Sequence, residues 1–210
     1  MKVNKAFIFM GMIGTATFVL QDVLGSLLWK AYNPVRMYIS YLTADGAPHL
    51  LMTRSLYTAY SIFLILFFVG MCYLAFRRWH SCLKIGYSVL LIVLFLSFIG
   101  IGSFPMTMEN VFAAQNTLHL IVTVGMLVLT ALMLYLLAIG YLKQEGLVKI
   151  GYLSLTAAIL FTVFNLLHLL VIVAGLDITG LVQRFSFYTF FIYLFLLSFY
   201  FVRKREDAEN

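Results

Sequence analysis

The sequence predicts an all-α integral membrane protein in which six transmembrane helices form one bundle. Three observations support this prediction: 63% of the 210 residues are hydrophobic, 10% are charged, and the apolar residues fall into six long runs. A soluble domain is about one quarter charged. Spans and short connections use the whole length, so residues 1–210 are expected to form a single domain.

Each run is long enough to cross about 30 Å of hydrocarbon, which takes about 20 apolar residues in a helix. The spans are expected to be helical because isolated strands would leave backbone groups unpaired in lipid. The first run continues to Trp29, too far for the apolar core of a signal peptide, so we expect it to be retained. The predicted spans are 6–29, 51–76, 85–104, 113–142, 150–174 and 185–202.

Lysine and arginine residues predict the orientation. Ten of the fourteen lie at one end of the spans and four at the other, which places both termini in the cytoplasm of a multi-pass protein of the cell membrane. The ten are Lys2, Lys5, Arg77, Arg78, Lys84, Lys143, Lys149, Arg203, Lys204 and Arg205, and the four are Lys30, Arg36, Arg54 and Arg184. Because the basic residues cluster at span ends, the net charge of +6 is explained by the membrane, and no nucleic-acid partner is predicted.

Ionisable side chains of three spans share one depth in the outer half of the membrane. At about 1.5 Å per residue, Asp22 lies about 10 Å inside the outer end of its span, and His119 and His168 lie about 9 Å inside theirs. The inner halves of the spans carry almost no such groups. Charges at bilayer depth cost about 2.5–3.5 kcal/mol and usually face partners in the bundle. We therefore expect a polar pocket that opens outward, between the first, fourth, fifth and sixth spans and beneath residues 30–50.

This pocket supplies the predicted site residues. His119 is expected to carry a proton or contact a head group, with Asp22 as its charge partner, so these two are the catalytic candidates. Arg54 and Arg184 are expected to bind an anion through their fork of donors, although either arginine would also offset the charge of Asp22. The remaining expected ligand-binding residues are Ser40, Glu109, Asn116, Asn165 and His168. Taken singly, each polar residue is more often a helix-packing hydrogen bond than part of a site.

Several chemistries lack a sequence motif. No HExxH pattern is present, small residues that would admit a haem are sparse, and no G-x-S-x-G surrounds Ser40 or Ser103, so no metal and no cofactor is predicted. All three prolines lie in outer loops rather than mid-span, which argues against a transporter. Three alternatives stay open. They are a metal-dependent hydrolase using Asp22, His119 and His168 with His49 from the loop, a solute-binding or transport component, and a non-catalytic scaffold or sensor with a membrane-protein partner.

Short motifs along the chain add a resemblance. They are NPVRMYISYLTADGAPHLLMTRSLY at 33–57, SFP at 103–105, LHL at 118–120 and GLVQR at 180–184. In these motifs and their order the chain resembles the bacterial and archaeal membrane family called domain of unknown function 998, whose last span tends to start with GL-x-x-R. The resemblance makes Ser40, Pro105, His119 and Arg184 family-pattern positions. The chain is also similar to the wider Frag/DRAM/Sfk group, which is associated with membrane lipid handling.

The leading hypothesis is therefore an integral membrane protein of unknown activity that binds or remodels a lipid or a lipid-linked head group in the outer leaflet. Lipid handling is implied only by analogy with distant relatives. The sequence does not decide whether the protein is an enzyme, nor its oligomeric state.

Overall fold

Six long helices and one short 3-10 helix form the part of the chain that the computed structural model describes, residues 5–107 and 114–206. They are α1 (Lys5–Leu28), η1 (Ile39–Thr43), α2 (Leu50–Arg78), α3 (Ser81–Ser103), α4 (Ala114–Leu142), α5 (Val148–Val173) and α6 (Thr179–Glu206). The six long helices are each long and apolar enough to cross a membrane. This confirms the predicted all-α fold of six transmembrane helices.

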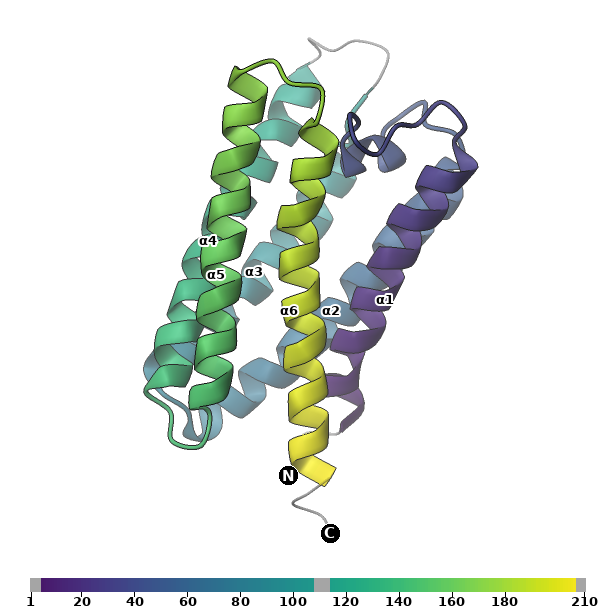
Figure 1. The fold of residues 1–210 in the computed structure, drawn as a ribbon. Helices are drawn as coiled ribbons and strands as arrows, with labels where there is room; N and C mark the ends of the chain where they lie inside the picture. The colour runs from purple at the N-terminus through teal and green to yellow at the C-terminus, as the bar shows by residue number, and fades with distance from the viewer. Residues whose placement is uncertain (1–4, 108–113, 207–210) are drawn as a thin grey trace.

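The helices form a closed ring, because each packs against the next in sequence and α6 returns to pack against α1 (Figure 1). The start of α1 and the end of α6 lie at one end of the bundle, which we call the terminal end (Figure 1). The ends of α1, α3 and α5 and the starts of α2, α4 and α6 lie at the other end, which we call the loop end. The loop end is the one that the charge distribution predicts to be outside the cell.

Two helices begin four or more residues before their predicted spans. α3 begins at Ser81 rather than at 85, because the His80 side chain accepts a hydrogen bond from the N–H of Cys82 at 3.2 Å and caps the helix. α6 begins at Thr179 rather than at 185. Its first turns contain polar residues, including Arg184, that are satisfied by contacts with the segment after α1 rather than by water.

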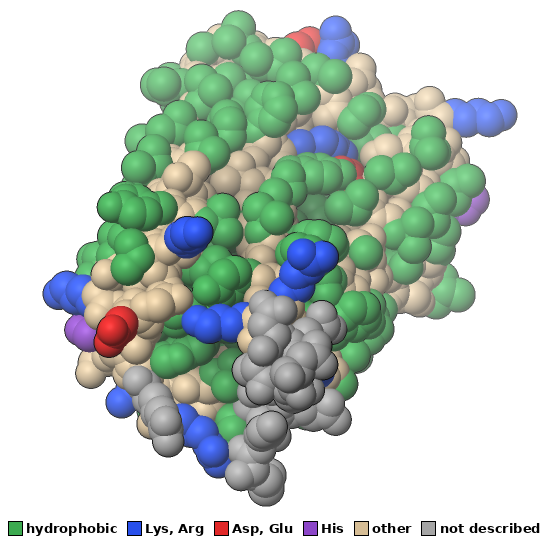
Figure 2. All heavy atoms as spheres, turned by 60° about the horizontal axis from the view of Figure 1, so that its bottom comes forward, with side chains coloured by type: hydrophobic (Ala, Val, Ile, Leu, Met, Phe, Trp, Pro, Cys, Tyr) green, Lys and Arg blue, Asp and Glu red, His purple; other side chains and the backbone are tan. Residues whose placement is uncertain are grey.

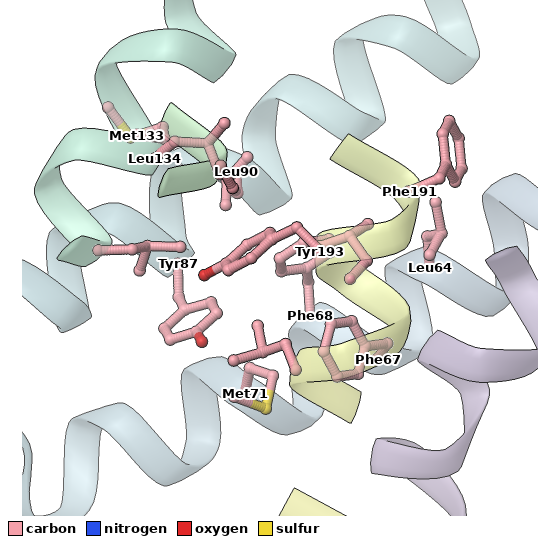
Figure 3. Close-up of a cluster of buried hydrophobic side chains, with 14 of the residues drawn as sticks. Leu64, Phe67, Phe68, Met71, Tyr87, Leu90, Met133, Leu134, Phe191 and Tyr193 are labelled. Atoms are coloured by element: carbon pink, nitrogen blue, oxygen red, sulfur yellow. The ribbon is translucent and has the colours of Figure 1, made fainter. Parts of the chain in front are cut away.

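A cluster of large apolar side chains fills the centre of the ring (Figure 3). The labelled members are Leu64, Phe67, Phe68, Met71, Tyr87, Leu90, Met133, Leu134, Phe191 and Tyr193. Hydroxyl groups are paired within this core: those of Tyr87 and Tyr141 with each other, and that of Tyr193 with Ser154 at 2.9 Å. The expectation that the inner halves carry almost no polar groups is therefore incomplete, since a buried tyrosine pairs its hydroxyl while its ring packs.

Small residues close the ring between α1 and α6. A Cβ atom added at Gly11 would lie 2.8 Å from the Cβ of Ser198, so the two backbones approach closely there. The Ser198 hydroxyl donates to the carbonyl of Ile8 at 2.6 Å, and the Thr15 hydroxyl donates to the carbonyl of Phe191 at 3.2 Å. Small and hydroxyl-bearing residues of this kind hold transmembrane helices together where lipid removes the usual hydrophobic drive.

We expect Gly11→Val to weaken ring closure, because the new side chain would collide with Ser198. Overpacking of this kind costs about 1–3 kcal/mol of unfolding free energy, which SDS-induced unfolding in mixed micelles would measure. Gly125→Val is the matched control, because a Cβ atom at this α4 glycine would meet nothing within 4 Å. An equal loss in both variants would contradict a tight α1–α6 contact.

Candidate functional site

The polar residues near the loop end form two separate networks rather than one pocket. The first, which we call the α1–α6 network, comprises Asp22, Tyr32, Arg184 and Tyr188. The second, which we call the α2–α4 network, comprises Asp45, Arg54, Gln115 and His119, joined through residues 104–107. The segment between α1 and α2 contributes to both networks, so the two are fixed relative to the same stretch of chain.

A bidentate ion pair lies at the centre of the α1–α6 network. Nη2 of Arg184 donates to Oδ1 of Asp22 at 2.8 Å and Nε donates to Oδ2 at 3.2 Å. The two side chains are 10% and 5% exposed. Oδ2 also accepts a hydrogen bond from the Tyr188 hydroxyl at 3.0 Å. Paired geometry of this quality offsets much of the cost of burying two charges.

The other donors of Arg184 are bound by the segment after α1. Nη1 donates to the carbonyls of Pro34 at 2.6 Å, Met37 at 3.0 Å and Gly180 at 3.2 Å. Nη2 also donates to the Tyr32 hydroxyl at 2.6 Å. A guanidinium has five N–H groups, and these contacts use all of them. Arg184 therefore keeps no donor for an anion, and its geometry supports a structural role in place of the predicted anion binding.

Tyr32 links this arginine to the turn around it. Its hydroxyl donates to the carbonyl of Tyr38 at 2.9 Å while it accepts from Arg184. Burial raises the pKa of Tyr32 to about 12, so the hydroxyl keeps the proton that it donates.

The start of α6 is shaped to receive the same segment. A Cβ atom at Gly180 would lie 2.3 Å from the carbonyl oxygen of Met37, so only glycine fits there. The N–H of Leu181 donates to the carbonyl of Val35 at 2.9 Å, which satisfies a donor that a helix start leaves unpaired. The GL-x-x-R pattern thus has a physical explanation: the glycine admits the loop, and Arg184 binds its carbonyls.

Asp22 is not the charge partner of His119, which corrects that prediction. Its carboxylate is bound by Arg184 and Tyr188, the second of the pairings that the sequence left open. His119 is buried instead between α4 and the end of α3, where Nδ1 lies 3.0 Å from the carbonyl of Phe104. Because a carbonyl only accepts, Nδ1 is the donor in this hydrogen bond.

Arg54 and Asp45 form the charged part of the α2–α4 network. Nη2 of Arg54 donates to Oδ1 of Asp45 at 2.6 Å, and Nε and Nη2 both donate to the carbonyl of Thr43 at 3.1 Å. Gln115 donates to Oδ2 of Asp45 at 3.0 Å and to the carbonyl of Pro105. The hydrogen bonds from Arg54 and Gln115 lower the pKa of Asp45, so the carboxylate stays charged.

A hollow of about 400 Å³ lies beside Arg54, between α2 and α3 near the loop end. Its lining residues are Thr43, Arg54, Tyr57, Thr58, Phe98, Ile99, Gly102, Ser103 and Pro105. None of Asp22, His119 and His168 lines it. This hollow therefore does not lie between the first, fourth, fifth and sixth spans, where the sequence predicts a pocket.

The remaining predicted site residues are dispersed. Ser40 contacts the sulfur of Met106 at 3.6 Å, Asn165 donates to Ser186 at 2.6 Å, and Asn116 exchanges hydrogen bonds with the backbone of Thr107. Glu109 lies outside the described residues.

His168 belongs to neither network. Its ring packs edge-on against Tyr38, with 5.6 Å between the ring centroids, and its buried Nε2 has no hydrogen-bond partner among the described residues. Within residues 5–107 and 114–206, no three His, Cys, Asp or Glu side chains come together as a set of metal ligands. The ligand set considered from the sequence is therefore not assembled in this structure.

Sequence reasoning missed Tyr32, Tyr188 and Gln115 as members of the networks. Tyr188 follows Arg184 by four residues and so shares its helix face, a signal that the sequence does contain. Tyr32 and Gln115 carry no such signal, because their partners are far along the chain.

Comparison with known proteins finds one family. The family model described as Protein of unknown function (DUF998) matches residues 12–200, a range that includes both networks and the hollow. No curated protein and no solved structure matches the chain.

We expect Asp22→Ala and Arg184→Ala each to lower the unfolding free energy by roughly 3–5 kcal/mol, because each leaves a buried charge without its partner. The double variant should lose less than the sum of the two, which a double-mutant cycle of SDS-induced unfolding would measure. Arg36→Ala is the control: its pair with Asp177 spans 3.6 Å between side chains that are 62% and 79% exposed. Strictly additive losses for Asp22 and Arg184 would contradict the pairing.

A second prediction concerns Gly180. The substitution Gly180→Ala should push the segment 33–39 off α6, because the methyl group would overlap the Met37 carbonyl. The amide of Ile39, which donates to Gln183 at 2.9 Å, should then exchange with deuterium faster, as measured by mass spectrometry of peptides from this segment. Unchanged exchange relative to Gly125→Ala would show that the close approach is not a constraint.

Proposed function

The chain belongs to the DUF998 family of proteins of unknown function, and we propose that this integral membrane protein binds the anionic head group of an outer-leaflet lipid in the hollow between α2 and α3. The observation that carries the proposal is that Arg54 uses only some of its hydrogen-bond donors within the described residues. Its Nε and Nη2 are held by Thr43 and Asp45, whereas Nη1 makes no hydrogen bond with any described residue. The guanidinium is thus oriented by the protein and keeps donors for a ligand.

The surroundings of Arg54 suit a lipid better than a small solute. Arg54 lies four residues after the start of α2 at Leu50, about 6 Å below the loop end, which is the level of head groups. The Arg54 side chain is 39% exposed, so a phosphate can reach it. Phe98 and Ile99 continue the wall of the hollow toward the centre of the bilayer, where acyl chains lie.

His119 contributes to this proposal by positioning the wall. It holds the carbonyl of Phe104, and the neighbours of Phe104 in sequence, Ser103 and Pro105, both line the hollow. If His119 carried a proton in lipid remodelling, its Nε2 would have to contact the lipid. Binding of the lipid does not require this contact. Binding is therefore the function that these contacts support best.

The test is native mass spectrometry of the protein purified from its membrane in mild detergent. Arg54→Gln removes the donors, and Gly102→Leu fills the hollow, since a Cβ atom at Gly102 meets nothing within 4 Å. Each should reduce retained phospholipid about tenfold, the effect of losing one charge-assisted hydrogen bond or its space.

Two variants serve as matched controls. Arg36→Gln removes another arginine of the loop end, and Gly125→Leu adds the same side chain to another open helical glycine. Both should retain lipid like the natural protein. No lipid on the natural protein, or equal retention in all four variants, would overturn the proposal and favour a scaffold or sensor.

A further inference from the structure

We infer a second lipid site at the terminal end of the same pair of helices, where the phosphate of an anionic phospholipid binds Lys84. The site is a hollow of about 300 Å³ between the end of α2 and the start of α3. Its lining residues are Phe76, Ser81, Lys84, Ile85, Ser88 and Val89. Phe76 follows Arg54 by 22 residues along α2, which is about 33 Å of helix, so the two hollows lie toward opposite leaflets.

Lys84 is the only charged residue in this lining. It is partly buried, and no described residue forms an ion pair or a hydrogen bond with its Nζ. Arg36, Arg54 and Arg184 differ from it in this respect, since each is paired with an aspartate. Lys84 is a half-buried residue with apolar neighbours and no counter-ion among the described residues, so an anion is the complement that this hollow lacks.

The polar groups of the hollow lie on one face of α3. Ser81 precedes Lys84 by three residues and Ser88 follows it by four, which places all three side chains on the same side of the helix. Ser81 and Ser88 flank Lys84 on this face, and a hydroxyl donates to a phosphate oxygen as an ammonium group does, although Ser88 also hydrogen-bonds the Cys72 side chain.

The walls identify the ligand as a lipid rather than a free phosphate. Phe76 is 60% exposed and Ile85 is 54% exposed, and both face the space where acyl chains lie. The exposed apolar surface continues toward the centre of the bilayer at the same helix faces, seven residues away, with Val69 on α2 and Ile92 on α3. An acyl chain would contact apolar side chains along this surface, whereas a free anion would make no favourable contact with them.

Charge around the hollow favours an anionic head group. Figure 2 shows basic side chains spread over the terminal end with few acidic ones among them. The described basic residues of this end are Lys5, Arg77, Lys84, Lys143, Lys149, Arg203 and Lys204. A surface of this charge concentrates acidic phospholipids, because each basic residue attracts their head groups. The inference does not rest on the proposed outer site, because the two hollows share no residue.

The experiment is a lipid titration read by native mass spectrometry, with phosphatidylglycerol and phosphatidylcholine of the same acyl chains. The natural protein should prefer phosphatidylglycerol, and Lys84→Gln should lower its binding about fivefold, the effect of removing one basic contact. Lys84→Arg should keep the preference. Lys149→Gln, a basic residue of the same end outside the hollow, should keep it too.

Two further arms separate the outcomes. Arg54→Gln should remove one bound lipid and leave the lipid that depends on Lys84, and the double variant should remove both. Inorganic phosphate added in excess should not displace phosphatidylglycerol; displacement would show a site for the free anion and would overturn the lipid assignment. Equal loss in Lys84→Gln and Lys149→Gln would also overturn it, because the effect would then be general surface charge.

Discussion

The pairing of Arg184 with Asp22 is the interaction on which the loop end depends. A guanidinium buried inside a membrane bundle is costly unless its N–H groups have acceptors, and the α1 carboxylate supplies acceptors for only part of that of Arg184. The Tyr32 hydroxyl and backbone carbonyls of the segment after α1 and of Gly180 supply the rest. This need explains why that segment lies against α6, why Gly180 has no side chain and why the helix begins at Thr179.

Bilayer thickness and the cost of buried charge both act along the helix axis, and the first of these constraints let the sequence predict the number of helices. Neither constraint specifies rotation about that axis or which helices become neighbours. Asp22, His119 and His168 were placed at one level, yet they face different partners: Arg184, the Phe104 carbonyl and the Tyr38 ring. A shared depth is therefore not evidence of a shared pocket.

Two arginines at the same end show how hydrogen-bond saturation distinguishes structure from binding. All N–H groups of Arg184 donate to acceptors of the protein. Arg54 donates through Nε and Nη2, whereas its Nη1 has no acceptor among the described residues. The residue type and the predicted side of the membrane do not distinguish these two arginines, since both lie on the side that the positive-inside rule disfavours. Only the count of committed N–H groups distinguishes them, and that count depends on loop backbone that no residue pattern locates.

The α1–α6 pair also has a consequence for biogenesis. Its two members are separated by 162 residues, so Asp22 enters the membrane long before Arg184 is synthesised. A nascent chain with five inserted helices carries a carboxyl group without its counter-charge and a first loop without the surface that receives it. The last helix thus closes the ring against α1 and at the same time supplies the counter-charge of Asp22.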